Sequence, residues 1–476
     1  MSSESRAPAR DGRASKRAFP VRANQLLKVR AVWISPLILG SVVVLLITAF
    51  YIGSVVDPVD HLHDLPVAVV NQDRTATIGA QRINIGQEVQ RGLSDTPAVS
   101  GRLGLADTTL GAAEQAMDRG AWYAAVVIPP GFTTSLLALA GVNAGGAGSG
   151  RPEIVILTNQ RAGTVGVSLA TGVLQPALAA ASVQIGRQLA AFVPAGASNS
   201  LTKAFLADPV TVTTAEYRPL PSHSALGLSA FYIALLILMC GFLGGIIVNS
   251  SVDAALGYAT TEIGPKWHQR QPLPINRWQT LIIKWVMAVV LTGLTTGLML
   301  LVAVGIFRMD APHVGLLWLL AWLAAASVAE GTIVLFAVLG ASFGQLLAML
   351  IFVYVGLASS GGTIPLQALP DVLRWLAELE PLRQILAGTR AILYFDAQAD
   401  AGLARAVTAA ALGLVFWLVV GVIVVRWYDH KGFNRLDPEL LAYVGGSVQE
   451  YKSRKADAGE QDSGNEGKQS EPGAQV

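Results

Sequence analysis

Six uninterrupted apolar stretches constrain this chain more than any other feature of its sequence. Each is close to the roughly 20 residues that an α-helix needs to cross the hydrocarbon core of a bilayer. They lie at about 32–56, 226–248, 281–307, 316–339, 346–364 and 404–425. Hydrophobic residues make up 52% of the 476 residues and charged residues only 14%, which is too apolar for an ordinary soluble chain of this length. We therefore expect an α-helical integral membrane protein with six transmembrane helices, one before and five after a long gap.

The basic residues of the N-terminal tail predict how these helices are oriented, because lysine and arginine near membrane ends favour the cytoplasmic side. The tail carries Arg6, Arg10, Arg13, Lys16, Arg17, Arg22, Lys28 and Arg30. Six crossings return the C-terminus to the same side, so residues 57–224 are expected to be extracytoplasmic. A cleaved signal peptide is the alternative for the first stretch, but its charged lead and apolar core are long and no A-x-A site follows. We expect a bacterial cytoplasmic (plasma) membrane protein with both termini in the cytoplasm.

The segment between the first two spans has the pattern of an α/β domain. Apolar or β-branched runs predict strands at 66–71, 122–129, 153–159 and 211–220. The stretch 163–192 is a predicted helix that either packs on the sheet or extends toward the membrane. The predicted organisation is a basic tail with an interfacial helix at 1–31, a first span at 32–56, an α/β domain at 57–224, a five-helix membrane domain at 225–426 and a largely disordered cytoplasmic tail at 427–476.

The stretch LASSGGTIPLQALP interrupts the fifth apolar run with serines, glycines and prolines. Small residues allow a neighbouring helix to approach closely, and a proline ends a helix. The next residues, 371–380, predict a short amphipathic helix anchored at the interface by Trp375. We interpret 359–394 as a broken, partly re-entrant outer hairpin, and an ordinary external loop is the alternative. Its candidate functional residues are Ser359, Ser360, Gly361, Gly362 and Pro365.

Several blocks resemble one known family in their order along the chain. They are PVAVVNQDRT, AMDRGAWYAAVVIPPGFTTSLL, VILTNQRAG, the LASSGG stretch and LRQILAGTRAIL. Together they resemble the YhgE/Pip (phage infection protein) family, within the type 2 ABC-transporter permease superfamily. The family-like motif in the outer domain comprises Asn71, Asp73, Pro129, Gly131 and Phe132. The resemblance implies a membrane permease subunit of an ABC-type exporter, working as a homodimer or paired permease on a lipophilic or cell-envelope substrate.

The chain carries no recognisable nucleotide-binding site of its own. No G-x-x-x-x-G-K-[ST] phosphate loop occurs, so ATP would bind a partner subunit. The resemblance places contact with that ATPase on a cytoplasmic helix within 251–285, where Glu262, Gly264 and Lys266 partly match an acidic coupling motif. An ordinary solvated loop whose charges serve topology is the alternative.

Glu330 falls near the middle of the fourth predicted span, where an ionised carboxylate is costly. It is a candidate intramembrane functional residue, as a substrate contact or a proton-binding group. A protonated carboxyl that hydrogen-bonds another helix is the alternative. Lys284 lies near a predicted membrane end and is interpreted as a snorkelling anchor.

Other classes of function find little support in the sequence. His61 and His63 lie among aspartates, but H-x-H without a third ligand at a typical spacing is a weak zinc signal. Hydrolase and metalloprotease motifs are absent, so we expect no catalytic residues, metal or directly bound cofactor, and a protein that is not an enzyme. A net charge of +2 gives no reason to expect nucleic acid as a partner. A non-transporting envelope scaffold or receptor, such as a secretion accessory or phage receptor, is the alternative to the exporter permease.

Overall fold

The computed structural model describes residues 28, 30–78, 81–141, 152–191, 193, 200–264, 266–268, 270, 272–273 and 275–433. The predicted N-terminal tail up to residue 27, the glycine-rich stretch 142–151 and the C-terminal tail from residue 434 lie outside the described residues. The chain divides into two compact units, residues 1–49 and 50–476.

Helix α2 (Arg30–Val55) supplies most of the described part of the first unit. After Arg30 it contains no charged residue, and its large apolar side chains, including Leu37 and Leu45, are exposed. Such a helix is long and apolar enough to cross a membrane.

The second unit begins with an α/β domain built on a five-stranded sheet in the order β4-β1-β5-β6-β7. The strands are β1 (Leu65–Asn71), β4 (Leu103–Asp107), β5 (Ala124–Ile128), β6 (Glu153–Thr158) and β7 (Thr211–Glu216). Strand β1 pairs in parallel with both β4 and β5, with Val67 opposite Leu105 and Ala124. Strand β6 is antiparallel to β5 and parallel to β7. The predicted strands are confirmed, and β4 was missed because LGLAD is short and holds only two large apolar residues.

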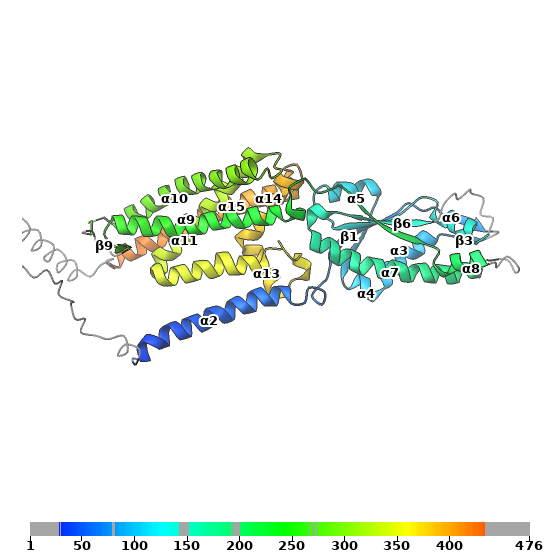
Figure 1. The fold of residues 1–476 in the computed structure, drawn as a ribbon, viewed down its shortest axis with the longest axis horizontal. Helices are drawn as coiled ribbons and strands as arrows, with labels where there is room; N and C mark the ends of the chain where they lie inside the picture. The colour runs from blue at the N-terminus through cyan, green and yellow to red at the C-terminus, as the bar shows by residue number, and fades with distance from the viewer. Residues whose placement is uncertain are drawn as a thin grey trace, which may run out of the picture. The chain divides into compact units, whose positions relative to one another are not determined.

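Helices cover both faces of this sheet, because each buried strand has apolar side chains on both sides. On one face lie α3 (Ile85–Asp95), α4 (Pro97–Ser100), α6 (Phe132–Leu139) and α7 (Thr164–Ala190), with α8 (Ser200–Ala207) packed on α7. On the other face, α5 (Leu110–Met117) packs Ala113 and Met117 against Ala68 and Val70. Figure 1 shows α7 running along the sheet, and its Leu174, Leu178 and Ile185 belong to the sheet core. The predicted helix 163–192 therefore packs on the sheet. A small hairpin, β2 (Ala76–Ile78) and β3 (Gln81–Ile83), completes the domain.

The rest of the second unit is a helical bundle. Its long helices are α9 (Ser229–Ala255), α10 (Arg277–Leu300, with a π-helical extension to Ile306), α11 (Val314–Ala348) and α15 (Leu403–His430). A π-helical segment (Met349–Val355) joins α11 to α12 (Gly356–Ser359), and α13 (Asp371–Leu379) and α14 (Pro381–Tyr394) follow. Helix α11 lies at the centre, contacting α9, α10, α14 and α15, and every residue from Ala324 to Phe336 is buried. Small residues allow this close packing: a Cβ on Gly241 of α9 would lie 2.5 Å from the Ala325 carbonyl oxygen.

Gly340 divides the run from Val314 to Ser359 into two helical segments. Its φ of 80° and ψ of 166° break the helix, and the chain folds back so that Gly344 packs against the backbone of Leu335. The second segment starts soon after Gly340, earlier than the predicted 346, and ends at Ser359. It therefore has nearly the length of a full crossing without the residues that follow Ser359.

Six helical runs among the described residues are long and apolar enough to cross a membrane. They are α2, α7, α9, α10, the run from α11 to α12, and α15. Because α7 packs on the sheet and Gly340 folds the α11–α12 run into two segments, the long apolar segments outside the α/β domain coincide in position with the six predicted spans.

Candidate functional site

The broken hairpin, residues 359–394, places small and polar residues inside the protein. Ser359 and Ser360 are buried, and the Ser359 hydroxyl donates to the Val355 carbonyl oxygen at 2.7 Å. The Ser360 hydroxyl accepts from the Gly362 N–H at 3.3 Å. Pro365 is extended and precedes a short 3-10 turn at Leu366–Ala368. The serines thus satisfy backbone groups where the helix ends, which a buried irregular segment requires.

The two glycines of the SSGG stretch are needed for different reasons. Gly361 has a φ of +71°, which disfavours residues with a Cβ. At Gly362 a Cβ would lie 2.1 Å from the Phe231 ring of α9. Gly361 therefore allows the chain to reverse direction, and Gly362 allows the backbone to pack directly against α9.

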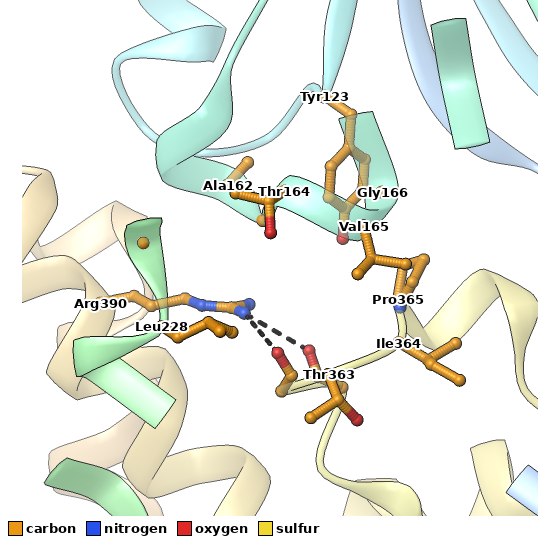
Figure 2. Close-up of a pocket in the computed structure, with 14 residues that line it drawn as sticks. Tyr123, Ala162, Thr164, Val165, Gly166, Leu228, Thr363, Ile364, Pro365 and Arg390 are labelled. Carbon is orange, nitrogen blue, oxygen red and sulfur yellow. Dashed lines mark hydrogen bonds between the residues drawn. The ribbon is translucent and has the colours of Figure 1, made fainter. Parts of the chain in front are cut away.

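Arg390 of α14, near the end of the hairpin, binds back to the SSGG stretch at its start. Its Nη2 donates to the carbonyl oxygens of Gly361 at 3.5 Å and Gly362 at 3.3 Å, drawn as dashed lines in Figure 2. Tyr123, just before β5, points toward the same small cavity, whose volume is about 10 Å³, or room for about one water. Burial lowers the pKa of Arg390 and raises that of Tyr123. This contact could not be predicted, because nothing in LRQILAGTRAIL indicates which carbonyl oxygens Arg390 reaches.

Arg390→Met is expected to destabilise the protein by about 1.5–3 kcal/mol, because the variant loses hydrogen bonds from a charged donor to partly buried carbonyls. Amide hydrogen exchange should accelerate across residues 360–369, and thermal unfolding in detergent should shift downward. Arg119→Met is the matched control, since Arg119 is a surface arginine that also donates to a backbone carbonyl. Unchanged exchange at 360–369 in Arg390→Met would show that the contact does not hold the hairpin.

Helix α13 is amphipathic and is followed directly by the buried residue Glu380. Leu373 and Ala377 are buried, whereas Val372 and Trp375 are exposed. Glu380 then caps α14 by accepting the Arg383 N–H at 3.0 Å, and its other oxygen has no hydrogen-bond partner among the described residues. Burial raises the pKa of Glu380 to about 8, partly opposed by backbone hydrogen bonds.

A pocket in the bundle lies between the hairpin helices and the long helices. We call it the bundle pocket; its volume is about 530 Å³, which is within the range of small-molecule sites. It is lined by Ala324, Ser327, Val328, Ile351, Phe352, Glu378, Leu379, Pro381, Gln384, Ile385, Ala406, Ala409, Ala410, Leu412, Gly413, Phe416 and Trp417. Nearly all of these are apolar, and Ser327, Glu378 and Gln384 are the polar members.

The polar members from α13 and α14 belong to an ion-pair network, which we call the rim. Glu378 accepts hydrogen bonds from Arg383 through one carboxylate oxygen and from Arg405 of α15 through the other, the latter at 2.5 Å. Arg405 also donates to Gln384 Oε1 at 2.9 Å. The hydrogen bond from Arg383 is the main cause that lowers the pKa of Glu378. The rim joins three helices beside an apolar pocket.

A second cavity of about 560 Å³ lies near the Gly340 turn and the ends of α9 and α10. Lys284 is buried there, with its Nζ 2.8 Å from Asp253 Oδ1 and 2.7 Å from Asn249 Oδ1. The prediction that Lys284 is a snorkelling anchor is therefore wrong. Its side chain turns inward because Asn249 and Asp253, one turn apart on α9, offer oxygens to it. That i, i+4 pair in an apolar helix was a signal that the sequence analysis missed.

The predicted coupling loop forms a β-hairpin rather than the expected helix. Its strands are β8 (Thr261–Ile263) and β9 (Lys266–His268), and Gly264 lies at the turn with a φ of +59°. Glu262 and Lys266 belong to these strands, but their side chains lie outside the described residues. A β-branched threonine and isoleucine, followed by glycine, favour this turn over a helix.

Glu330 lies in the buried centre of α11. It is 1% exposed, and neither carboxylate oxygen has a hydrogen-bond partner among the described residues. The structure thus does not supply the interhelical hydrogen bond of the sequence-based alternative. Glu330 also does not line the bundle pocket, although Ser327, one turn earlier, does.

The family-like motif of the α/β domain has a local structural role beyond the carboxyl ends of the neighbouring strands β1 and β5. The Asp73 carboxylate accepts the N–H groups of Gly86 at 3.2 Å and Thr133 at 3.1 Å, and also the Thr133 hydroxyl at 2.5 Å. Asn71 Oδ1 accepts the Asp73 N–H at 3.0 Å. Pro129 and Gly131, whose φ is +76°, lead from β5 into α6, where Phe132 is buried in the sheet core. Asp73 thereby joins the N-termini of α3 and α6.

The six long apolar helical runs among the described residues indicate a multi-pass membrane protein by their length and composition. A family model described as a protein of unknown function, DUF3533, matches residues 36–423, so the chain belongs to the DUF3533 family. The resemblance to the YhgE/Pip family stays a prediction.

Two further comparisons add little to this assignment. A crystal structure of a domain assigned to an ABC type-2 transporter of Thermotoga maritima is similar with 19% sequence identity and a TM-score of 0.22. That similarity covers 35% of this chain and 97% of the other chain. No protein of curated function gives a significant match.

Proposed function

We propose that this chain is the membrane permease subunit of an ABC-type exporter that moves a lipophilic or cell-envelope substrate outward. The bundle pocket is the observation that carries the proposal. It is an apolar cavity of ligand size, lined by residues of the long helices α11 and α15 and of the hairpin helices α13 and α14. A pocket of this kind suits an apolar ligand with a small number of polar groups to orient it.

The broken hairpin supports the same proposal. Its helices are short, one of them presents exposed apolar side chains, and its residues contact both the pocket and the α/β domain. In our proposal the hairpin lies at the extracytoplasmic surface of the cytoplasmic membrane. The α/β domain is then extracytoplasmic, and both termini are cytoplasmic. The orientation rests on the basic N-terminal tail.

A separate ATPase would drive transport, because the sequence has no phosphate-binding loop. We propose that two copies pair and that the loop of Glu262, Gly264 and Lys266 contacts this ATP-binding subunit. ATP would then bind the partner, and this chain would bind no cofactor and catalyse no reaction itself.

The β8–β9 hairpin favours a second candidate function. Its geometry differs from the coupling helix that the family resemblance implies. A loop whose described residues form a hairpin in place of that helix fits a non-transporting envelope scaffold or receptor, which needs no ATPase.

Photo-crosslinking separates these two functions. A photoreactive amino acid at Thr260, an exposed residue just before β8, should capture an ATP-binding-cassette subunit in intact cells. The same amino acid at Asp400, an exposed position between α14 and α15, is the matched control and should not capture it. Capture of only a secretion component from Thr260 would favour the scaffold and count against the exporter.

Ligand binding in the bundle pocket is tested by comparing probe labelling before and after a bulky side chain is placed in the pocket. A photoactivatable fatty alcohol added to the full chain in lipid nanodiscs should label Ile385 and Phe416, as mapped by mass spectrometry. Ala410→Trp should reduce that labelling at least tenfold, because Ala410 lines the pocket. Val419→Trp places the same indole on the exposed side of α15 and should leave the labelling unchanged. Equal labelling in both variants would show that the pocket does not hold the probe.

A further inference from the structure

The charge at the rim is unbalanced. Arg383 and Arg405 share one ionised partner, Glu378, which uses one carboxylate oxygen for each guanidinium. The neighbouring acid Glu380 forms no ion pair with either arginine among the described residues, since its carboxyl is buried and accepts the Arg383 backbone N–H instead. Gln384, the remaining polar group, is uncharged. The rim therefore carries about one positive charge.

The two arginines keep donors available for a ligand. A guanidinium has five N–H donors. Arg405 uses one each for Glu378 and Gln384, and the Arg383 side chain uses one for Glu378. Half of the Arg405 side chain is exposed. Planar guanidinium groups match the oxygens of phosphate or carboxylate groups, so the free donors favour an anionic partner.

This charge lies at the edge of an apolar cavity. Glu378 and Gln384 line the bundle pocket and also bind the two arginines, so the charged groups and the apolar lining are neighbours. A ligand that satisfies both parts has an apolar tail and an anionic head. Apolar burial would provide most of the affinity, and the arginines would select the head.

We propose that the bundle pocket binds an anionic amphiphile, with its tail among the apolar residues of α11, α14 and α15 and its head between Arg383 and Arg405. This inference rests on the proposed function and adds the substrate class. In the bound state, the head replaces part of the contact that Arg405 makes with Glu378. Phosphate, sulfate and carboxylate heads share the required chemistry.

Two photoactivatable lysophospholipids with the same acyl chain test this proposal on the full chain in nanodiscs. One probe is lysophosphatidylglycerol, whose phosphodiester gives it a net negative charge. The other is lysophosphatidylcholine, whose choline cation balances the charge of the same phosphodiester. The anionic probe should label Ile385 and Phe416 at a concentration at least tenfold lower than the zwitterionic probe. The difference should shrink in high salt, because the rim is partly exposed.

Variants of the rim separate a selective role from a structural one. Arg405→Gln should abolish the preference for the anionic probe over the zwitterionic probe, because it removes one of the two guanidinium groups that select the head. Glu378→Gln should strengthen binding of the anionic probe several-fold, because it removes the competing carboxylate. Arg218→Gln is the matched control, since Arg218 is also a half-exposed arginine 2.8 Å from an aspartate, Asp118, and lies outside the pocket.

The outcomes distinguish this inference from the proposed function. Equal labelling by both probes in the wild-type chain would overturn the inference and leave the apolar pocket intact as a binding site. Loss of preference in Arg218→Gln as well as in Arg405→Gln would also overturn it, because the effect would then reflect overall charge. Failure of both probes and of the fatty alcohol to label the pocket would instead reject the proposed function.

Discussion

Lys284→Met alone is expected to destabilise the protein by about 3–5 kcal/mol, because it removes the ammonium group that lies 2.8 Å from the Asp253 carboxylate inside the bundle. The Lys284 and Asp253 side chains are only 7% and 11% exposed, so water cannot readily replace the lost contact. Asn249 also loses the donor that its side-chain oxygen accepts at 2.7 Å. Thermal unfolding of the detergent-solubilised chain, followed by circular dichroism, measures the change.

The double variant Lys284→Met/Asp253→Leu gives the decisive comparison. Removing both charges avoids an uncompensated buried ion, so this variant should recover most of the stability lost by the single one, and replacing a buried pair by apolar residues is often neutral or stabilising. Lys431→Met, on an exposed lysine beyond the end of α15, should change the free energy of unfolding by less than about 0.5 kcal/mol. Equal losses in the single and double variants would show that the charges themselves are not coupled.

Glu380→Gln is expected to stabilise the protein increasingly as the pH rises from about 5 to 8. The pKa of Glu380 is about 8 in the fold against an ordinary value of 4.5, so within this window the folded chain keeps a proton that the unfolded chain has lost. The free energy of unfolding of the wild-type chain therefore falls with rising pH, by up to about 3–5 kcal/mol from this group. Glutamine stays neutral throughout, and its side-chain oxygen can still accept the Arg383 N–H.

Chemical unfolding at pH 5 and pH 8 measures the effect as a difference between variant and wild type. Glu216→Gln, at the exposed end of β7, is the matched control and should show no such trend. A difference between Glu380→Gln and wild type that is the same at both pH values would mean that Glu380 is ionised in the fold.

The spans and central strands could be predicted because burial of a whole segment leaves a continuous apolar run in the sequence. Val67 and Val126 lie in such runs, and so does each long helix of the bundle. The edge strand β4 could not be predicted in this way, because its half-buried positions accept small and polar residues and leave no continuous apolar run. The turn at Gly340 was placed within a gap between two predicted spans, but its sharpness depends on a positive φ that the sequence does not reveal.

Side-chain contacts across the bundle were the least predictable part of the candidate site. The serines and glycines of the broken hairpin stand out in an apolar run, and therefore could be selected from the sequence. Arg390, which contacts two of them, lies far along the chain and is paired with carbonyls that carry no sequence signature. Lys284 was misread because its distance from a membrane end does not say which way its side chain points. Tertiary packing, and no local pattern, decides these contacts.

The Asp73 carboxylate binds the N-termini of α3 and α6 in the way that a bound anion would. In many folds with parallel strands, helix N-termini at the sheet edge are where a phosphate docks. Here a side chain of the protein itself takes the N–H groups of α3 and α6. A search for ligands guided by fold analogy would point to that edge, yet any incoming phosphate would first have to displace Asp73 and separate two helices. The Asp73 side chain thus occupies the position where this topology would otherwise offer an anion-binding site.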